Sequence, residues 1–211
     1  MTHYVELFAV FTVQLLVIVD PIAGLPVFLA ITPEAGQAER KRMVWRGVLA
    51  AFCVIVFFLL CGRPLLAYFG IGAAAVRICG GILLFVIALE MLYGRPTGTG
   101  TSRREERLAG AKDDISFTPL AFPLLAGPGA IATSLLFAQQ AQGAGDYLAL
   151  LAAAAVVFAL TGVLLARADR LLRMVGDLGA AILTRLMGLV LAFLAVQYVV
   201  DGVRAVFGVT T

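Results

Sequence analysis

Long apolar blocks dominate the chain, and six of them approach the length needed to cross a bilayer. A transmembrane helix requires about 20 consecutive, mostly apolar residues. The blocks cover approximately residues 6–31, 44–62, 72–93, 117–139, 147–166 and 180–206. The pattern therefore predicts an all-α membrane protein with six transmembrane helices and a lipid bilayer around most of its surface.

The polar residues between the blocks predict how the chain is oriented. Twelve Lys and Arg residues fall in the loops after the first, third and fifth blocks, whereas the opposite side holds Arg63 and Arg204. Basic loops stay on the cytoplasmic side of a membrane. We therefore expect a multi-pass protein of a bacterial-type inner membrane with both termini outside, in the periplasm.

Composition narrows the class of protein. Hydrophobic residues make up 62% of the chain and charged residues 14%, a balance typical of membrane proteins. The basic residues lie in loops without a soluble domain, so we expect no nucleic-acid partner. The three cysteines lie inside apolar blocks and His3 is the single histidine, so we expect no metal site and no cofactor.

The two halves of the chain resemble each other. A shift of 108 residues aligns the third block with the sixth and gives five identical pairs. The matched pairs are Arg77 and Arg185, Gly80 and Gly188, Leu83 and Leu191, Phe85 and Phe193, and Gly94 and Gly202. Three spans per half is an odd number, so the halves enter the membrane from opposite sides. We predict two inverted-topology three-helix repeats, 1–94 and 116–211, joined by a basic cytoplasmic linker at 95–115.

The first span of each half is interrupted. In the first, Asp20-Pro21 lies near the centre and is followed by Ala23, Gly24 and Pro26. Proline lacks an N–H and clashes with the preceding turn, so we expect Pro21 and Pro26 to kink or break this helix. A charged Asp20 facing lipid would cost about 3 kcal/mol or more, so it is expected to face the protein interior or a wet cavity.

The second interruption is the triplet Gly127-Pro128-Gly129. We expect the chain to unwind there and a new half-helix to begin near Ala130, with Thr133 and Ser134 in its first turns. The N–H groups and dipole of such a helix start attract an anion. Structural kinks are the alternative for either break alone, but two matched breaks with one Asp favour a binding site.

Other polar residues inside the spans have simpler interpretations. Arg77 and Arg185 either extend to the membrane surface or act as gating or coupling residues. Gln14 and Gln197 are candidates for hydrogen bonds between helices. Gly80, Gly81 and Gly188 are expected to allow close helix packing rather than to bind a ligand.

The segments DPIAGLPVFLAIT (20–32) and PLLAGPGAIAT (123–133) resemble motifs of the MarC family, also called the neutral amino acid transporter family. The resemblance covers essentially the whole chain. This chain has Ala23-Gly24 where the family often has Gly-Asn. The resemblance implies a transporter of small neutral amino acids such as glycine, alanine or serine, driven by a cation gradient, with export the expected direction.

The residues and the resemblance together give one main hypothesis. It is secondary transport by alternating access at a midplane site, coupled to H⁺ or Na⁺, because the chain carries no nucleotide-binding motif. Asp20 and the carbonyls of an unwound stretch from Asp20 to Gly24 would hold the substrate ammonium, and the half-helix after Gly129 would hold its carboxylate. The alternative is a non-transporting membrane scaffold or regulatory protein, whose basic loop at 103–112 docks a partner or anionic lipid. An enzyme is disfavoured, because Asp20 has no second acid at mid-span.

Overall fold

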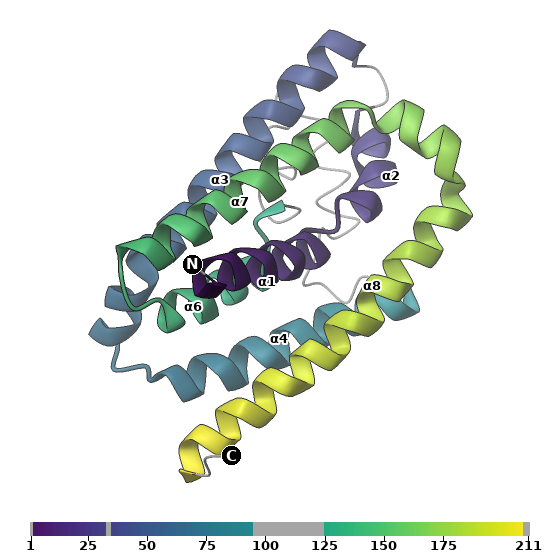
Figure 1. Ribbon diagram of the computed structural model, residues 1–211. Helices are drawn as coiled ribbons and strands as arrows, with labels where there is room; N and C mark the ends of the chain where they lie inside the picture. The colour runs from purple at the N-terminus through teal and green to yellow at the C-terminus, as the bar shows by residue number, and fades with distance from the viewer. Residues whose placement is uncertain (1, 33–34, 95–124, 209–211) are drawn as a thin grey trace.

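The computed structural model describes residues 2–32, 35–94 and 125–208, and all regular structure in these ranges is helical. The helices are shown in Figure 1. Their bounds are α1 Thr2–Val19, α2 Pro21–Ile31, α3 Gln37–Tyr68, α4 Ala73–Tyr93, α6 Pro128–Gln140, α7 Ala144–Ala166 and α8 Ala168–Phe207. The predicted all-α class is confirmed.

Five segments of the described ranges are long and apolar enough to cross a membrane. They are Thr2–Ala30, Gln37–Tyr68, Ala73–Tyr93, Ala144–Ala166 and Leu178–Phe207, which match five of the six predicted spans. The remaining block, 117–139, begins outside the described residues, and its later part is α6. The predicted linker at 95–115 and the basic loop at 103–112 also lie outside the described residues.

Two helices extend beyond the apolar blocks that predicted them. The helix α3 begins at Gln37, seven residues before its block, because the basic residues of this stretch are themselves good helix formers. The predicted loop after the fifth block is also helical from Ala168. Within α8 the chain turns sharply at Gly176, whose φ of 70° favours glycine, so the first turns of α8 are set off from its membrane span.

The helices pack as a central group and a flanking pair. In the central group α7 contacts both α1 and α3, and α6 contacts α3. Its buried side chains include Phe11, Leu15, Ile55, Leu150 and Phe158. The flanking pair is α4 and α8, which lie side by side along their length (Figure 1). The pair reaches the central group through contacts of α4 with α6 and of α8 with α2.

Glycines set the close contact between α4 and α8. A Cβ atom at Gly81 of α4 would lie 2.7 Å from the Ala195 carbonyl oxygen of α8. A Cβ at Gly188 of α8 would lie 2.8 Å from the Cβ of Met91, and one at Gly202 would lie 3.1 Å from the Ala74 carbonyl oxygen. Small residues allow helix backbones to approach closely in membranes, where packing drives association. The packing role expected for Gly81 and Gly188 is confirmed.

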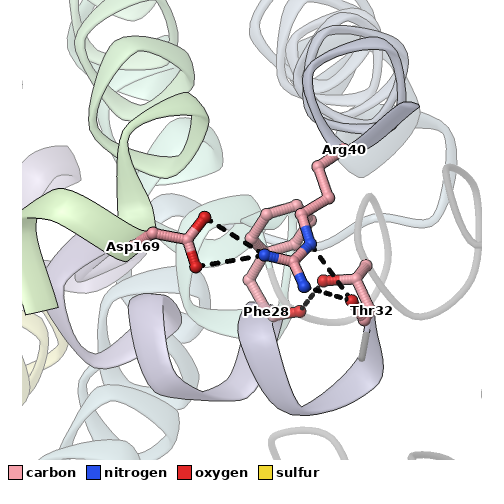
Figure 2. A network of polar contacts seen from close by, with 4 residues as sticks. All are labelled: Phe28, Thr32, Arg40 and Asp169. Atoms are coloured by element: carbon pink, nitrogen blue, oxygen red, sulfur yellow. Dashed lines mark hydrogen bonds and ion pairs between the residues drawn. The ribbon is translucent and has the colours of Figure 1, made fainter. Parts of the chain in front are cut away.

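The end of the short helix α2 is held by one arginine (Figure 2). Arg40 of α3 donates from Nε and Nη2 to the Thr32 carbonyl oxygen, at 3.1 and 2.7 Å. Its Nη1 donates to both carboxylate oxygens of Asp169 at 3.1 Å. The planar guanidinium thus joins the C-terminal end of α2, where the helix dipole is negative, to the start of α8. We call this network the Arg40 clasp.

The close contact at Gly81 leads to a stability prediction. Gly81→Ala is expected to lower the free energy of unfolding by about 1–3 kcal/mol, because the added methyl group forces α4 and α8 apart. Thermal unfolding in detergent measures the change. The neighbouring Ile82 is 53% exposed, so Ile82→Ala removes more atoms but is expected to change stability little. A Gly81→Ala protein as stable as the wild type would contradict close packing at this point.

The Arg40 clasp leads to a second stability prediction. Arg40→Lys keeps the charge but loses the fork that reaches Thr32 and Asp169 together, so we expect a loss of about 1–3 kcal/mol. The control is Arg42→Lys, the same exchange at an exposed position two residues further along α3. Equal thermal stability of the two variants would show that the charge alone suffices.

Candidate functional site

The first break is a single residue, Asp20. Its backbone has φ 38° and ψ 68°, which makes Asp20 the one non-glycine residue with positive φ in the described part of the chain. Aspartate is one of the few side chains that tolerate this left-handed conformation. Its Oδ1 atom accepts a hydrogen bond from the Ala23 N–H at 3.2 Å, so the side chain caps the N-terminus of α2.

The break is shorter than the sequence suggested. Helix α2 begins immediately at Pro21 and continues through Pro26, and the Gly24 N–H already donates to the Asp20 carbonyl oxygen at 3.2 Å. The expectation of an unwound stretch from Asp20 to Gly24 is therefore wrong. Proline at the first helical position suits a helix start, since that N–H has no helical partner anyway. The two prolines still supply no N–H to the carbonyls of Val17 and Ile22.

The second carboxylate oxygen of Asp20 is available for other chemistry. Its Oδ2 atom is buried and has no hydrogen-bond partner among the described residues. Thr184 of α8 faces the same carboxyl group. The expectation that Asp20 faces the protein interior agrees with this arrangement. Thr184 was not singled out from the sequence, because a lone threonine in an apolar span has no distinctive pattern.

The second break opens the helix α6. This helix starts at Pro128 with Gly127 before it in extended conformation, two residues earlier than the start expected near Ala130. Its N-cap residue, Gly127, has no side chain that could cap this N-terminus. Its positive end, with the N–H groups of Gly129 and Ala130 in the first turn, therefore lacks the carboxylate that α2 receives from Asp20.

Two hydroxyl groups lie in the next turn of α6, and both side chains are fully buried. Ser134 donates to the Ala130 carbonyl oxygen at 2.8 Å, the usual bond of a serine to its own helix. The Thr133 Oγ1 atom has no partner among the described residues. A buried hydroxyl without a partner is destabilising, and such atoms are often found where a ligand or water binds.

The two breaks lie close together. A Cβ atom at Gly129 would lie 3.1 Å from Cγ2 of Ile18, two residues before Asp20, and 2.6 Å from Cδ1 of Ile87. The missing side chain of Gly129 thus makes room for α1 and α4 rather than for a ligand. Residues on both sides of each break also share one buried cluster. These residues are Val19, Leu25, Leu125, Ala126 and Ala130.

The remaining predicted residues differ in their surroundings. Gly24 faces α7, since its Cβ position lies 3.6 Å from Cδ2 of Leu165. Arg77 is half-buried between α4 and α8 and lies near Tyr198. Arg185 directly follows Thr184, but its side chain is exposed. The two matched arginines therefore occupy unlike environments, and the structure does not bring them together.

A buried glutamine and a half-buried tyrosine link α1 to α8. The Tyr198 hydroxyl donates a hydrogen bond to Oε1 of Gln14, which is 9% exposed. The interhelical bond expected for Gln14 is confirmed. The corresponding expectation for Gln197 is wrong, because its Nε2 donates to Asp201 of its own helix at 2.9 Å. Residues four apart on one helix face meet readily, and this favours the local bond.

The unpartnered hydroxyl leads to a prediction. Thr133→Val removes an unsatisfied buried group at nearly constant shape and is expected to leave stability unchanged or raise it by up to about 1 kcal/mol. Thr161→Val is the matched control, since Thr161 is equally buried but donates to the Val157 carbonyl oxygen at 2.8 Å. That control is expected to lose about 0.5–1.5 kcal/mol in thermal unfolding. A larger loss for Thr133→Val than for Thr161→Val would indicate a bonded Thr133.

Comparisons with known proteins give the family. The model of the MarC family, described as integral membrane proteins, matches residues 5–207. A UPF0056 membrane protein of Methanocaldococcus jannaschii is 37% identical over 89% of this chain and 91% of its own length. The UPF0056 membrane protein YvbG of Bacillus subtilis is 33% identical over 94% and 95% of the two chains.

A further relative is the UPF0056 inner membrane protein YhgN of Escherichia coli, 34% identical over 91% of this chain and 93% of its own. No solved structure matches the chain. The family model spans both breaks, from within α1 to the end of α8. The chain belongs to the MarC family of integral membrane proteins.

Proposed function

We propose that the protein is a secondary transporter of small neutral amino acids, with its substrate site between the two breaks. The observation that carries the proposal is a pair of atoms. Among the described residues, the buried side-chain polar atoms without a hydrogen-bond partner are Asp20 Oδ2 and Thr133 Oγ1. One belongs to each break, and the breaks are in contact through Ile18 and Gly129.

The two breaks offer complementary charges to a zwitterion. The substrate ammonium group binds Asp20 Oδ2, with the carbonyls of Val17 and Ile22 as further acceptors. The substrate carboxylate binds the uncapped N-terminus of α6, and Thr133 donates to it. The side chains packed around Gly129 would exclude a bulky substrate side chain, which favours glycine, alanine or serine.

The helix contacts support an inverted repeat. In the predicted repeat α3 corresponds to α7 and α4 to α8, and each of these pairs is in contact. The second half of the first span, α2, corresponds to α6, and both begin with proline after a break. The contact of α2 with α7 likewise has a counterpart in that of α6 with α3. Rocking of one half against the other around the central site would give alternating access.

The relative named as an inner membrane protein supports the same membrane for this chain. In that membrane the basic starts of α3 and α8 face the cytoplasm and both termini face the periplasm. A proton or sodium gradient drives transport, and Asp20 is the coupling candidate. The scaffold alternative depends on the loop at 103–112, which lies outside the described residues, so it stays a prediction.

Flux measurements test the transport proposal. Purified protein in liposomes is expected to carry radiolabelled glycine or alanine across the membrane. Asp20→Asn is expected to reduce this flux at least about tenfold, because the neutral amide loses the charge-assisted bond to the ammonium group. Glu39→Gln, which neutralises an exposed carboxylate of α3, serves as the control. Equal flux through the Asp20→Asn and Glu39→Gln proteins would remove Asp20 from the mechanism.

Competition separates the two ends of the proposed site. Glycinamide keeps the ammonium group but lacks the carboxylate, so it is expected to compete poorly with labelled glycine. L-alanine and L-serine are expected to compete well. Inhibition by glycinamide as strong as that by alanine would contradict a carboxylate site at the start of α6.

A further inference from the structure

A polar cavity lies away from the two breaks. It has a volume of about 400 Å³ and opens between α1, α6 and α8. Glu6 and Gln14 line it from α1, Gln140 and Phe137 from α6, and Asp201 and Tyr198 from α8. Acidic, amide and hydroxyl groups thus converge from three helices that are separate in the sequence. The proposed substrate site does not include any of them.

The charge of this cavity is one-sided. Glu6 and Asp201 are carboxylates, and no Lys or Arg is among the described residues that line the cavity. His3 also lines it, and its Nε2 lies 3.1 Å from Oδ1 of Asp146, the carboxylate with which it pairs. Arg77 of α4 lies near Tyr198 and is not part of the lining. Carboxylates and amide oxygens accept hydrogen bonds from an ammonium group and attract cations. The chemistry therefore suits a solute that carries an ammonium group.

The cavity lies along the helix faces that lead to the breaks. Glu6 and Gln14 are eight residues apart on α1, about 12 Å, and Asp20 lies a further six residues along the same direction. On α6, Thr133 lies one turn below Phe137, on the same face. The inner end of the cavity, at Gln14 and Phe137, thus lies six residues from Asp20 along the chain and one helical turn from Thr133.

Phe137 closes the inner end of the cavity, and we call it the floor. Phe137 is 3% exposed, and its ring centroid lies 4.8 Å from that of Phe11. Beside it the hydrogen bond from Tyr198 to Gln14 joins α8 to α1. A solute in the cavity therefore reaches Thr133 only after Phe137 moves or the Tyr198–Gln14 bond opens.

We propose that this cavity is an access vestibule, which gathers ammonium-bearing solutes before the Phe137 floor opens toward Asp20 and Thr133. The assignment of the deeper site rests on the proposed transport function. The charge selectivity of the vestibule does not, because it depends only on Glu6 and Asp201. The two claims are therefore testable separately.

Thiol modification tests the charge selectivity. The exposed Cys53, Cys61 and Cys79 are first replaced by alanine, and a single reporter is introduced as Gln140→Cys. In lipid nanodiscs, where both faces are accessible, a cationic methanethiosulfonate is expected to react several-fold faster than an anionic one of similar size. Ala73→Cys, exposed at the start of α4 and outside the cavity, gives the reference ratio.

Neutralisation of the two carboxylates tests whether they cause the charge selectivity. Glu6→Gln combined with Asp201→Asn is expected to bring the Gln140→Cys ratio down to the Ala73→Cys ratio. Size-exclusion chromatography confirms that each variant remains folded and monodisperse. The proposal is overturned if Gln140→Cys and Ala73→Cys show the same ratio of cationic to anionic reaction rates while Glu6 and Asp201 are present. It is also overturned if the double neutralisation leaves the Gln140→Cys ratio unchanged.

A deeper reporter tests the floor. Thr133→Cys is expected to react at least about tenfold more slowly than Gln140→Cys, because it is fully buried below Phe137. Phe137→Ala is expected to raise its rate toward that of Gln140→Cys. Equal rates at the two depths, or no gain with Phe137→Ala, contradict a closed floor above the site.

The flux experiment separates this inference from the proposed function. Charge-selective labelling with no glycine flux through the wild-type protein supports the vestibule and removes the transport proposal. Glycine flux with labelling that ignores reagent charge supports transport and removes the vestibule.

Discussion

A helix that begins inside a bilayer must satisfy N–H groups that lipid cannot bond, and this constraint shapes the centre of the molecule. For α2 the solution is one carboxylate. Asp20 adopts a left-handed backbone, ends α1, and places Oδ1 on the N–H of Ala23. A carboxylate has two oxygens, and capping uses one of them. The other is buried and has no hydrogen-bond partner in the part of the chain that the structure describes. The same residue therefore breaks the span, stabilises the new helix and presents a buried acceptor.

The two breaks are alike in layout but differ in charge. Both helices start with proline, yet α2 has a carboxylate at its N-terminus and α6 has a glycine. One positive helix end is thus balanced by its own N-cap residue, and the other has an N-cap residue without a side chain. In the proposed site this difference would let a zwitterion bind in one orientation only. The paired α4 and α8, held close by glycines, flank this centre.

Much of the fold was predictable, because apolar blocks and prolines carry strong signals. Five spans, the break at Asp20 and the helix start beside Gly127 follow from the sequence alone. The extent of the breaks could not be predicted from the sequence. A proline that starts a helix and a proline that unwinds one look the same in a sequence. Pro26 inside α2 is the clearest example. Neighbours such as Thr184 beside Asp20, or Tyr198 beside Gln14, depend on which helix faces meet, and no local pattern encodes that. The helical start of α8 was missed because its charged residues were interpreted as a loop.

The helix α2 is fixed at both ends by ionisable side chains. Its 11 residues span about 16 Å, with Asp20 at one end and the Arg40 clasp at the other. A short rod held in this way cannot tilt gradually, because any large movement must first release charge-assisted hydrogen bonds. Such a movement would then depend on release of the Arg40 clasp, which lies at the opposite end of α2 from Asp20 and from anything bound there. Ionic conditions on the side of the clasp would alter how often α2 moves without altering what the centre binds.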